Sequence, residues 1–287
     1  MILALFLAPA VLTILISLTN LRVSTGLSQY QWVGLANYGQ MTRSPWLVLV
    51  LRNTVIYVVG TLVFFNVGMA LVLALLTVHV STQAAGVFRI LWMLPRITPS
   101  VVYALMWRWF AAQPPYGTLN QLLGLVGIPG HNWMNAHPWG FVITLNGFVG
   151  ASFGMLIFSS AISAIPRDQY LAAQVDGASA WQQIRRITLP WLRWPVLFVT
   201  AYQTLSLLTS FEYILLTTNG GPGFFVTEVW SLYAFHLALS NYFGNTQFGL
   251  GAAFAAVLVV LGVAASLTYL RVFRFGELVG PPRIEVN

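Results

Sequence analysis

The sequence contains no cysteine and no lysine, and it carries few charges of either sign. All 13 basic residues are arginines, and charged residues make up 7% of the 287 positions. Without cysteine there is no disulfide, thiol nucleophile or thiolate metal site. Without lysine there is no phosphate-binding loop of the GK[ST] type and no Schiff-base chemistry. If this protein works with ATP, another subunit must bind the ATP.

Lipid is the expected solvent for much of this chain, because there is too little charge to cover a soluble surface. Hydrophobic residues make up 58% of the sequence and the mean hydropathy is +0.78, whereas a soluble domain carries about 25% charged residues. The net charge is +7. The sequence has no basic patch interleaved with aromatic residues of the kind that binds nucleic acid. The positive charge is therefore expected to interact with the cytoplasmic surface of the membrane.

Six segments are long and apolar enough to cross a bilayer as helices. The hydrocarbon core is about 30 Å thick, which requires about 20 residues per helix. The predicted spans are residues 1–19, 53–78, 87–109, 139–162, 194–212 and 248–270. The first segment lacks the basic flank and the cleavage site of a signal peptide. The sequence therefore predicts an all-α integral membrane protein with a single membrane domain over residues 1–287.

An even number of spans places both termini on one side of the membrane. If that side is the cytoplasm, eight arginines lie inside and four lie outside, as the positive-inside rule favours. The predicted outer segments are residues 21–52, 110–138 and 213–247. The predicted cytoplasmic loops are residues 80–86 and 163–193. We therefore expect a multi-pass protein with both termini in the cytoplasm.

The 163–193 loop is polar, although its flanks are apolar. It contains the stretch "IPRDQYLAAQVDGASAWQQIRRITLP". Residues 166–176 are predicted to form one short helix, and Gly177 suits a left-handed position that ends it. Ser179 can cap a second helix that runs to about Thr188, and Pro190 helps to end it. Two interpretations remain open at this point. The loop is either a rigid protruding element that binds a soluble partner, or a capped loop that lies on the lipid headgroups.

This stretch resembles the coupling loop of inner-membrane permease subunits of binding-protein-dependent ABC importers, which have an EAA…DGA…G-like loop ending in I-x-LP. The matching residues are Ala172, Ala173, Asp176, Gly177, Ala178, Trp181, Ile187, Leu189 and Pro190. Four further segments resemble the same family in the same order: "WVGLANYGQM", "LRNTVIYVV", "FRILWMLPRITPSVVYALMWRWF" and "TTNGGPGFFVTEVWSLYAF". They cover nearly the whole chain and resemble the sugar-importing branch, the maltose and glycerol-phosphate permease type.

The resemblance implies a type I importer permease fold in a bacterial or archaeal plasma membrane. The chain would be a non-catalytic subunit without a cofactor, and it would form half of a pore for di- or oligosaccharides or related polyols. Its implied partners are a second permease, two cytoplasmic ATPases that hold ATP and Mg, an extracytoplasmic sugar-binding protein and membrane lipid. The loop would insert into a groove on an ATPase. The residues implied for this coupling are Asp168, Leu171, Ala172, Ala173, Asp176, Gly177, Ala178, Trp181, Arg185 and Pro190.

One residue of the loop departs from the family pattern. The family usually has a glutamate directly before the two alanines, and here Leu171 takes that position. The glutamate is expected to pair with an arginine of the ATPase. Asp168 or Asp176 is a candidate substitute, and a partner permease that keeps its glutamate would tolerate the loss. The departure therefore favours a second permease of a different sequence.

The family's solute lies near mid-membrane, on the helices on either side of the loop. By spacing from the loop, the implied solute-path residues are Asn146, Gly150, Phe153, Gln203, Leu207 and Ser210. Amide side chains suit sugar hydroxyls, and an aromatic face can cover a pyranose ring. Asn146 and Gln203 can equally hold helices together, and Gly150 with Gly154 forms a small-xxx-small packing pair.

Two ionisable residues lie in or beside the predicted spans, where such groups usually face a bundle interior or a pathway. Arg96 lies between Pro95 and Pro99, where the family usually has an aromatic or apolar residue. It is either a structural arginine, held by carbonyls freed by the prolines or by the partner permease, or a group that recognises an anionic or hydroxyl-rich solute. Glu212 is either an interfacial carboxylate or part of an outer gate.

Other functions are less well supported by the residues. A secondary transporter or channel subunit that is not driven by ATP often shows inverted repeats and midplane carboxylates, and neither is evident. The four histidines form no ligand-spaced pair, so no metal site is predicted. The acidic residues are too dispersed for paired-carboxylate catalysis, which argues against a membrane enzyme.

Overall fold

The computed structural model describes residues 2–24, 29–78, 80–240 and 246–272. Within these residues the chain is helical, as predicted. The described residues form no strand and one isolated antiparallel bridge, between Thr19 and Trp32. The predicted all-α class is therefore confirmed.

Three helical segments of the described chain are each long and apolar enough to cross a bilayer: Leu47–Thr77, Pro138–Ser163 and Phe248–Tyr269. They correspond to three of the predicted spans. The first contains, in chain order, α3 (Leu47–Gly60), the π-helical η1 (Thr61–Met69) and α4 (Ala70–Val78). The second is α9 (Pro138–Ser163) and the third belongs to α16 (Phe248–Val272).

The prediction of one continuous helix over residues 87–109 is wrong. The chain forms α5 (Thr82–Ile97) and α6 (Ser100–Phe110), which bend by 101° at the break between them. Thr98 and Pro99 have extended backbones, with ψ of 134° and 135°. Proline disfavours helical backbone in the residue before it and has no N–H to donate. The pair counts as one broken span or as a re-entrant segment.

The remaining two predicted spans correspond to shorter helices, α1 (Ile2–Ser17) and α13 (Arg193–Thr209). The predicted 194–212 helix ends early, because Ser210 has an extended backbone with ψ of 115°. A separate helix, α14 (Glu212–Thr217), follows. The described residues thus contain three long apolar helices, or four with the bent pair. The count of six spans stays a prediction.

The predicted outer segments contain short helices of their own. These are α2 (Ala36–Thr42), α7 (Thr118–Leu125), α8 (Trp133–Ala136) and α15 (Trp230–Ala238). Most side chains of α15 are buried, including Trp230 and His236. This helix packs on α3 and α16. Within the 213–247 segment, α15 is therefore part of the folded core.

The helix α9 lies at the centre of the bundle, in contact with η1, α4, α5 and α13. Its approach to η1 and α4 is close at Gly150 and Gly154. A Cβ at Gly150 would overlap the Asn66 side chain, and one at Gly154 would meet the backbone of Asn66 and the Ala70 methyl group. The small-xxx-small packing expected from the sequence is therefore present.

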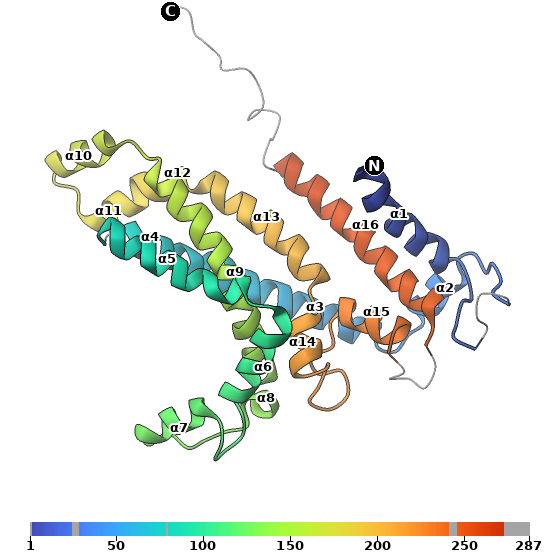
Figure 1. Ribbon diagram of the computed structural model, residues 1–287. Helices are drawn as coiled ribbons and strands as arrows, with labels where there is room; N and C mark the ends of the chain where they lie inside the picture. The colour runs from blue at the N-terminus through green and yellow to red at the C-terminus, as the bar shows by residue number, and fades with distance from the viewer. Residues whose placement is uncertain (1, 25–28, 79, 241–245, 273–287) are drawn as a thin grey trace, which may run out of the picture.

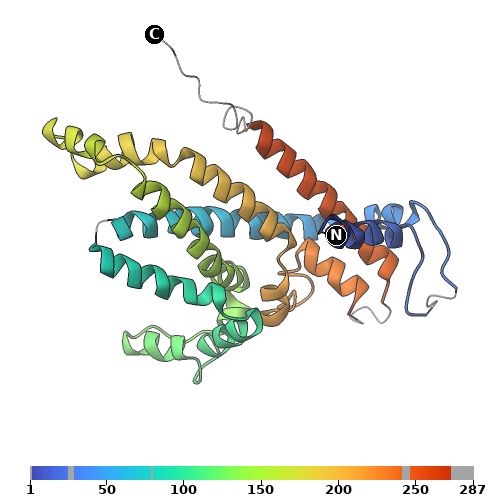
Figure 2. The same ribbon diagram turned by 45° about the horizontal axis from the view of Figure 1, so that its top comes forward.

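The two ends of the bundle carry different segments. In Figures 1 and 2 the helices α10 to α12 of the 163–193 loop project at one end, and α7 lies at the other. In Figure 1, α1 begins and α16 ends on the upper side, as the 163–193 loop does. This arrangement separates the polar loop from the predicted outer segments.

Candidate functional site

The 163–193 loop forms two helical arms joined at a glycine. The first arm is α10 (Arg167–Val175), and Gly177 follows with a left-handed φ of 76°. A residue with a Cβ is strained in that conformation. The second arm comprises α11 (Ala180–Gln183), the π-helical η2 (Ile184–Thr188) and α12 (Leu189–Trp191). The predicted helix–glycine–helix form is confirmed.

The second arm does not end where the sequence predicts. It continues past Thr188 and through Pro190 to Trp191. The wider turns of η2 lie directly before Pro190, where a π-helical stretch relieves the crowding that a proline ring causes in an α-helix. Leu192 then bonds back from its N–H to the Thr188 carbonyl, and α13 begins at the next residue. The arm is therefore nearly continuous with the following span.

Side-chain hydrogen bonds hold the two arms in a fixed arrangement. Ser179 and Gln182 form a reciprocal capping box at the start of the second arm, which confirms the predicted cap. The Tyr170 hydroxyl lies 2.9 Å from the Thr188 hydroxyl. Across the same junction, Trp191 Nε1 donates to Gln169 Oε1 at 3.1 Å. The first arm is therefore tied to the second arm at two points.

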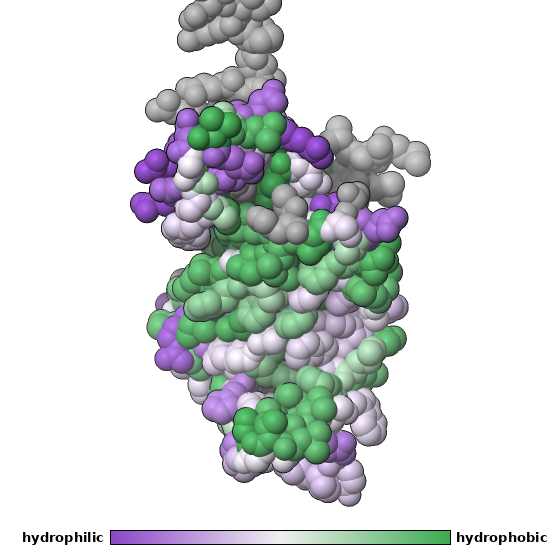
Figure 3. Space-filling model, turned by 90° about the vertical axis from the view of Figure 1, so that its left-hand side faces the viewer, coloured by the Kyte–Doolittle hydropathy of each residue, from purple (hydrophilic) through white to green (hydrophobic). Residues whose placement is uncertain are grey.

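The tip of this loop exposes apolar side chains among polar ones. Leu171 is 57% exposed, Val175 88% and Trp181 65%. Figure 3 shows hydrophobic surface within the hydrophilic upper end of the molecule. Asp168 and Asp176 are also exposed, and neither has an ion-pair partner among the described residues. A soluble partner could cover such a mixed surface.

A hollow lies between the two arms and gathers several of the implied coupling residues. Its lining residues are Ala173, Asp176, Gly177, Ala178, Gln182, Gln183, Arg186 and Ile187. Ala172 and Arg185 lie exposed on the arms, and Pro190 lies exposed at the base of the second arm. The structure thus brings most of the predicted coupling residues to one protruding element.

The predicted solute-path residues fall into two groups, and the first is a buried polar network. The Asn146 amide contacts the Tyr57 hydroxyl and donates to Ser210 Oγ at 3.1 Å. On the same face of α9, Gln203 Nε2 donates to the Gly150 carbonyl at 2.9 Å. Asn146 and Gln203 are 6% and 3% exposed, so these contacts join α9 to α3 and α13.

Leu207 belongs to the apolar core beside this network and is 3% exposed. The same core contains Leu145 of α9 and Ile214 of α14. In this structure Leu207 therefore packs helices together and presents little surface to a solute.

The second group lies on a different face and is more open. The Arg96 guanidinium lies over the Phe153 ring, 5.0 Å from its centroid. Phe153 in turn lies 4.7 Å from the Tyr202 ring and 6.4 Å from the Phe198 ring. Glu212 is exposed at the start of α14. The structure therefore brings Arg96 and Phe153 together and separates them from the buried amides.

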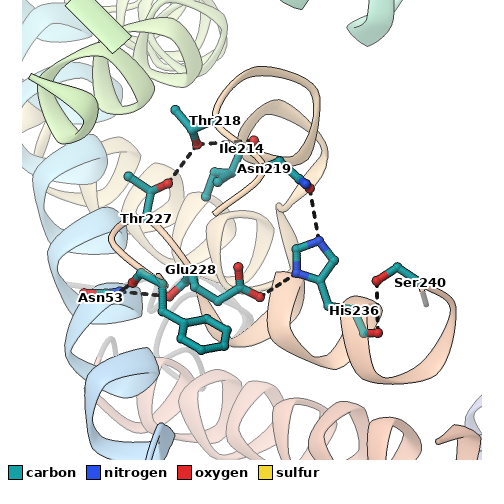
Figure 4. Close-up of polar contacts among 9 residues, drawn as sticks. Asn53, Ile214, Thr218, Asn219, Thr227, Glu228, His236 and Ser240 are labelled. Carbon is teal, nitrogen blue, oxygen red and sulfur yellow. Dashed lines mark hydrogen bonds and ion pairs between the residues drawn. The ribbon is translucent and has the colours of Figure 1, made fainter. Parts of the chain in front are cut away.

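Sequence reasoning missed a buried acid–base pair in the 213–247 segment. His236 Nδ1 lies 2.8 Å from Glu228 Oε1, and the two side chains are 1% and 2% exposed (Figure 4). His236 Nε2 lies 3.1 Å from Asn219 Oδ1. Burial raises the pKa of the Glu228 carboxyl, while the hydrogen bond and charge of His236 oppose that rise. The only sequence signal was two ionisable residues eight positions apart.

A second missed contact joins two segments that resemble the same family. Asn53 Nδ2 donates to the carbonyl oxygens of Phe225 and Glu228 (Figure 4). Thr54 Oγ1 accepts from the Trp230 N–H at 2.8 Å. The "LRNT" stretch of α3 therefore holds the "GGPGFFVTEVW" stretch in place.

Among the described residues, no group of three or more His, Asp or Glu side chains is placed to hold a metal ion.

The apolar helices of the bundle define a multi-pass membrane protein, and a two-armed polar loop projects at one end of it. Residues 66–274 match the family described as "Binding-protein-dependent transport system inner membrane component". The chain belongs to this family, since the match covers most of its length.

Curated relatives agree with this assignment. The trehalose/maltose transport system permease protein MalF of Thermococcus litoralis is 30% identical over 262 residues, which are 88% of this chain and 84% of that protein. The sulfoquinovosyl glycerol transport system permease protein SmoG of Agrobacterium fabrum is 29% identical over 263 residues, which are 90% of this chain and 82% of that protein. Both relatives are permease proteins of transport systems.

A solved structure shares the fold. It is a chain of a bacterial ABC transporter involved in the import of the acidic polysaccharide alginate, with a TM-score of 0.76. The match covers 97% of this chain and 92% of that chain, at 23% sequence identity. The bundle described above is therefore the ABC-importer permease fold.

Proposed function

We propose that this chain is the membrane-spanning permease subunit of an ATP-driven importer of sugars, such as di- or oligosaccharides or related polyols. It forms half of the translocation path, and a second permease of different sequence forms the other half. Family membership supports the transport role. The named substrates of the relatives, trehalose or maltose in one and sulfoquinovosyl glycerol in the other, support the sugar class.

The observation that carries the proposal is the 163–193 loop, a folded element that projects from the bundle and exposes both apolar and acidic side chains. The proposed occupant of this surface is one of two cytoplasmic ATPase subunits, which bind ATP and Mg. This chain has no catalytic role and binds no cofactor. An extracytoplasmic sugar-binding protein delivers the solute at the opposite end.

The loop is suited to transmit movement because it is rigid and tied to the spans on both sides. The contacts Tyr170–Thr188 and Gln169–Trp191 link the first arm to the second arm, which leads into α13. A displacement of the loop by closing ATPases therefore moves α13 instead of bending the arms. This is a rigid-body transition of the kind that switches a pore between two states.

The surface at Leu171 supports a contact without the usual glutamate. Leu171 is exposed beside the first turn of α10, and Asp168 lies one turn earlier on the same face, since residues three apart are neighbours on a helix. We assign the main contact to apolar packing by Leu171 and Val175, with Asp168 as the acidic group. A second permease that keeps its glutamate would supply the stronger ion pair.

The two groups of path residues take different roles in this proposal. Asn146 and Gln203 hold the helices together, since both are buried and hydrogen-bonded to neighbouring helices. Arg96 and Phe153 face the solute. Glu212 lies at the outer end of the same path.

The proposed orientation places the loop and both termini in the cytoplasm of a bacterial or archaeal cell. The arginine distribution supports it, and so does the start of α1 and the end of α16 on the side of the 163–193 loop in Figure 1. The predicted outer segments then face the binding protein.

The test is co-purification of the ATPase with variants of the loop. Gly177→Pro, or deletion of residues 166–190, is expected to remove the ATPase from the purified complex and to abolish sugar-stimulated ATP hydrolysis. Gly127→Pro is the matched control, because Gly127 has a similar φ of 77° in a predicted outer segment. The proposal fails if the deletion variant still recovers stoichiometric ATPase, or if uptake continues without ATP.

A further inference from the structure

Arg96 places a guanidinium deep within the broken span. It is the fifteenth residue of α5, so it lies about 20 Å along the helix from Thr82, at about 1.5 Å per residue. The residues around it in α5 are mostly apolar, and Leu94 and Ile97 are 47% and 69% exposed on the helix surface. A guanidinium keeps its positive charge, and a charge at such depth is costly unless something compensates it.

No carboxylate in the described part of the chain pairs with this charge. No Asp or Glu oxygen lies within 4.0 Å of Arg96, since His236 and Glu228 form the one ion pair of that part. No described residue accepts a hydrogen bond from the guanidinium, and the Leu94 carbonyl, two residues earlier, accepts from the N–H and the hydroxyl of Thr98. Arg96 and Glu212 form no ion pair with each other.

One aromatic ring of α9 lies against the guanidinium, and two rings of α13 lie beside that ring. Phe153 of α9 lies beneath Arg96, and Phe198 and Tyr202 of α13 lie beside Phe153, with the Phe198 and Tyr202 rings stacked at 20°. Phe198 is 55% exposed and Tyr202 45%. We call these four residues the Arg96 cluster. It combines open apolar faces, which suit the C–H faces of a sugar ring, with the N–H donors of a guanidinium that no described residue uses.

We propose that the Arg96 cluster binds a saccharide that carries an oxyanion, a carboxylate or a sulfonate, during its passage through the membrane. The guanidinium donates two parallel hydrogen bonds to the oxyanion, and the rings cover the sugar. A neutral sugar would leave this partly buried charge without an anionic partner. This inference rests on the proposed import function and narrows its substrate class to acidic saccharides.

The test uses the absence of cysteine from this chain. Tyr202→Cys introduces a single thiol into the cluster of the complete complex, purified with its second permease and ATPases but without the binding protein. The rates of modification by an anionic sulfonatoethyl and a cationic trimethylammonium-ethyl methanethiosulfonate are compared in the Arg96 and Arg96→Gln backgrounds. Leu125→Cys is the control, because Leu125 is 83% exposed on α7, away from the cluster.

The measured quantity is the modification rate with the anionic reagent divided by the rate with the cationic reagent. For the thiol at position 202, this ratio is expected to fall at least about fivefold in Arg96→Gln, because a nearby unit positive charge is removed. The ratio at the α7 control stays unchanged. Trigalacturonate slows modification at position 202 in the Arg96 and Arg96→Lys backgrounds, but not with Arg96→Gln. Neither maltotriose nor inorganic sulfate gives comparable protection.

Four results overturn the inference: no modification of the thiol, a rate ratio independent of residue 96, no protection by trigalacturonate, or equal protection by maltotriose or sulfate. A failure here is distinguishable from a failure of the proposed function. The complex that is labelled still contains its ATPase and hydrolyses ATP, whereas the proposed function fails through the loop variants described above.

Discussion

The side-chain amide of Asn53 donates to the backbone carbonyl of Glu228 at 3.0 Å, although 175 positions separate the two residues. The same amide donates to the Phe225 carbonyl at 2.8 Å. Asn53 is fully buried on α3. A helix of one predicted span therefore holds the loop that connects α14 to α15 from within.

Asn53→Ala is expected to destabilise the complex by about 2 kcal/mol, because it leaves two buried carbonyl groups without their donors. The measurement is the thermal unfolding midpoint of the purified complex. Asn135→Ala is the matched control, since Asn135 is exposed on α8 and surface changes usually stay within about 0.5 kcal/mol. Equal midpoints for the two variants would contradict the assigned role.

His236→Leu is expected to lower the free energy of unfolding by about 3 kcal/mol, because it leaves the Glu228 carboxyl buried without its partner. It also raises the pKa of Glu228 further, since His236 is what opposes the effect of burial. A carboxyl with a raised pKa in the folded state binds its proton more tightly there, so stability falls as pH rises above the ordinary value near 4.5. The loss is therefore larger at pH 8 than at pH 5.

The double variant Glu228→Gln, His236→Gln separates pairing from packing. Two amides can restore a hydrogen bond without a charge, so the double variant is expected to be more stable than His236→Leu and to lose the pH dependence. Unfolding midpoints at pH 5 and pH 8 measure both effects. An unchanged pH dependence in the double variant would assign it to other groups.

Tyr170→Phe removes the hydroxyl that bonds Thr188 and leaves the ring in place. We expect ATPase to remain bound, because the exposed tip of the loop is unchanged. Sugar uptake per ATP is expected to fall by roughly threefold, since one hydrogen bond contributes about 0.5–1.5 kcal/mol to the rigidity of the loop. Transport and hydrolysis measured in the same proteoliposomes test this. Loss of ATPase together with transport would instead indicate a docking role for Tyr170.

Gln203→Leu and Phe153→Ala distinguish helix packing from solute contact. Gln203→Leu is expected to cost about 1 kcal/mol of stability and to leave the KM for sugar unchanged, because its amide is bound to the Gly150 carbonyl. Phe153→Ala is expected to raise KM by roughly fivefold, since it removes an aromatic face of the Arg96 cluster. A raised KM for Gln203→Leu would return that residue to the solute path.

The helix–glycine–helix form of the 163–193 loop was predictable because its determinants are local. A left-handed glycine and a Ser179–Gln182 capping box act within a few residues of each other. The close packing at Gly150 and Gly154 was also predictable, since small residues four apart mark a helix contact in lipid.

Whether a helix ends or continues at a proline, in contrast, could not be predicted from the local sequence pattern. Pro99 breaks its helix, whereas the second arm of the loop continues through Pro190. The π-helical η2 lies directly before Pro190, whereas α5 continues through Pro95 without such a stretch and ends two residues later. Residue type alone cannot separate these cases.

The sequence by itself determined the solvent of the chain, its helical class, its apolar segments and the two-armed loop, because these follow from composition and from neighbours along the chain. The tertiary structure decided which polar side chains are bonded to other helices and which have no bonding partner among the described residues. Asn146 and Gln203 are bound to other helices, Glu228 is buried against His236, and Arg96 lies over Phe153 with no acceptor among the described residues. These outcomes depend on contacts between residues far apart in the chain, which are set only when the helices pack.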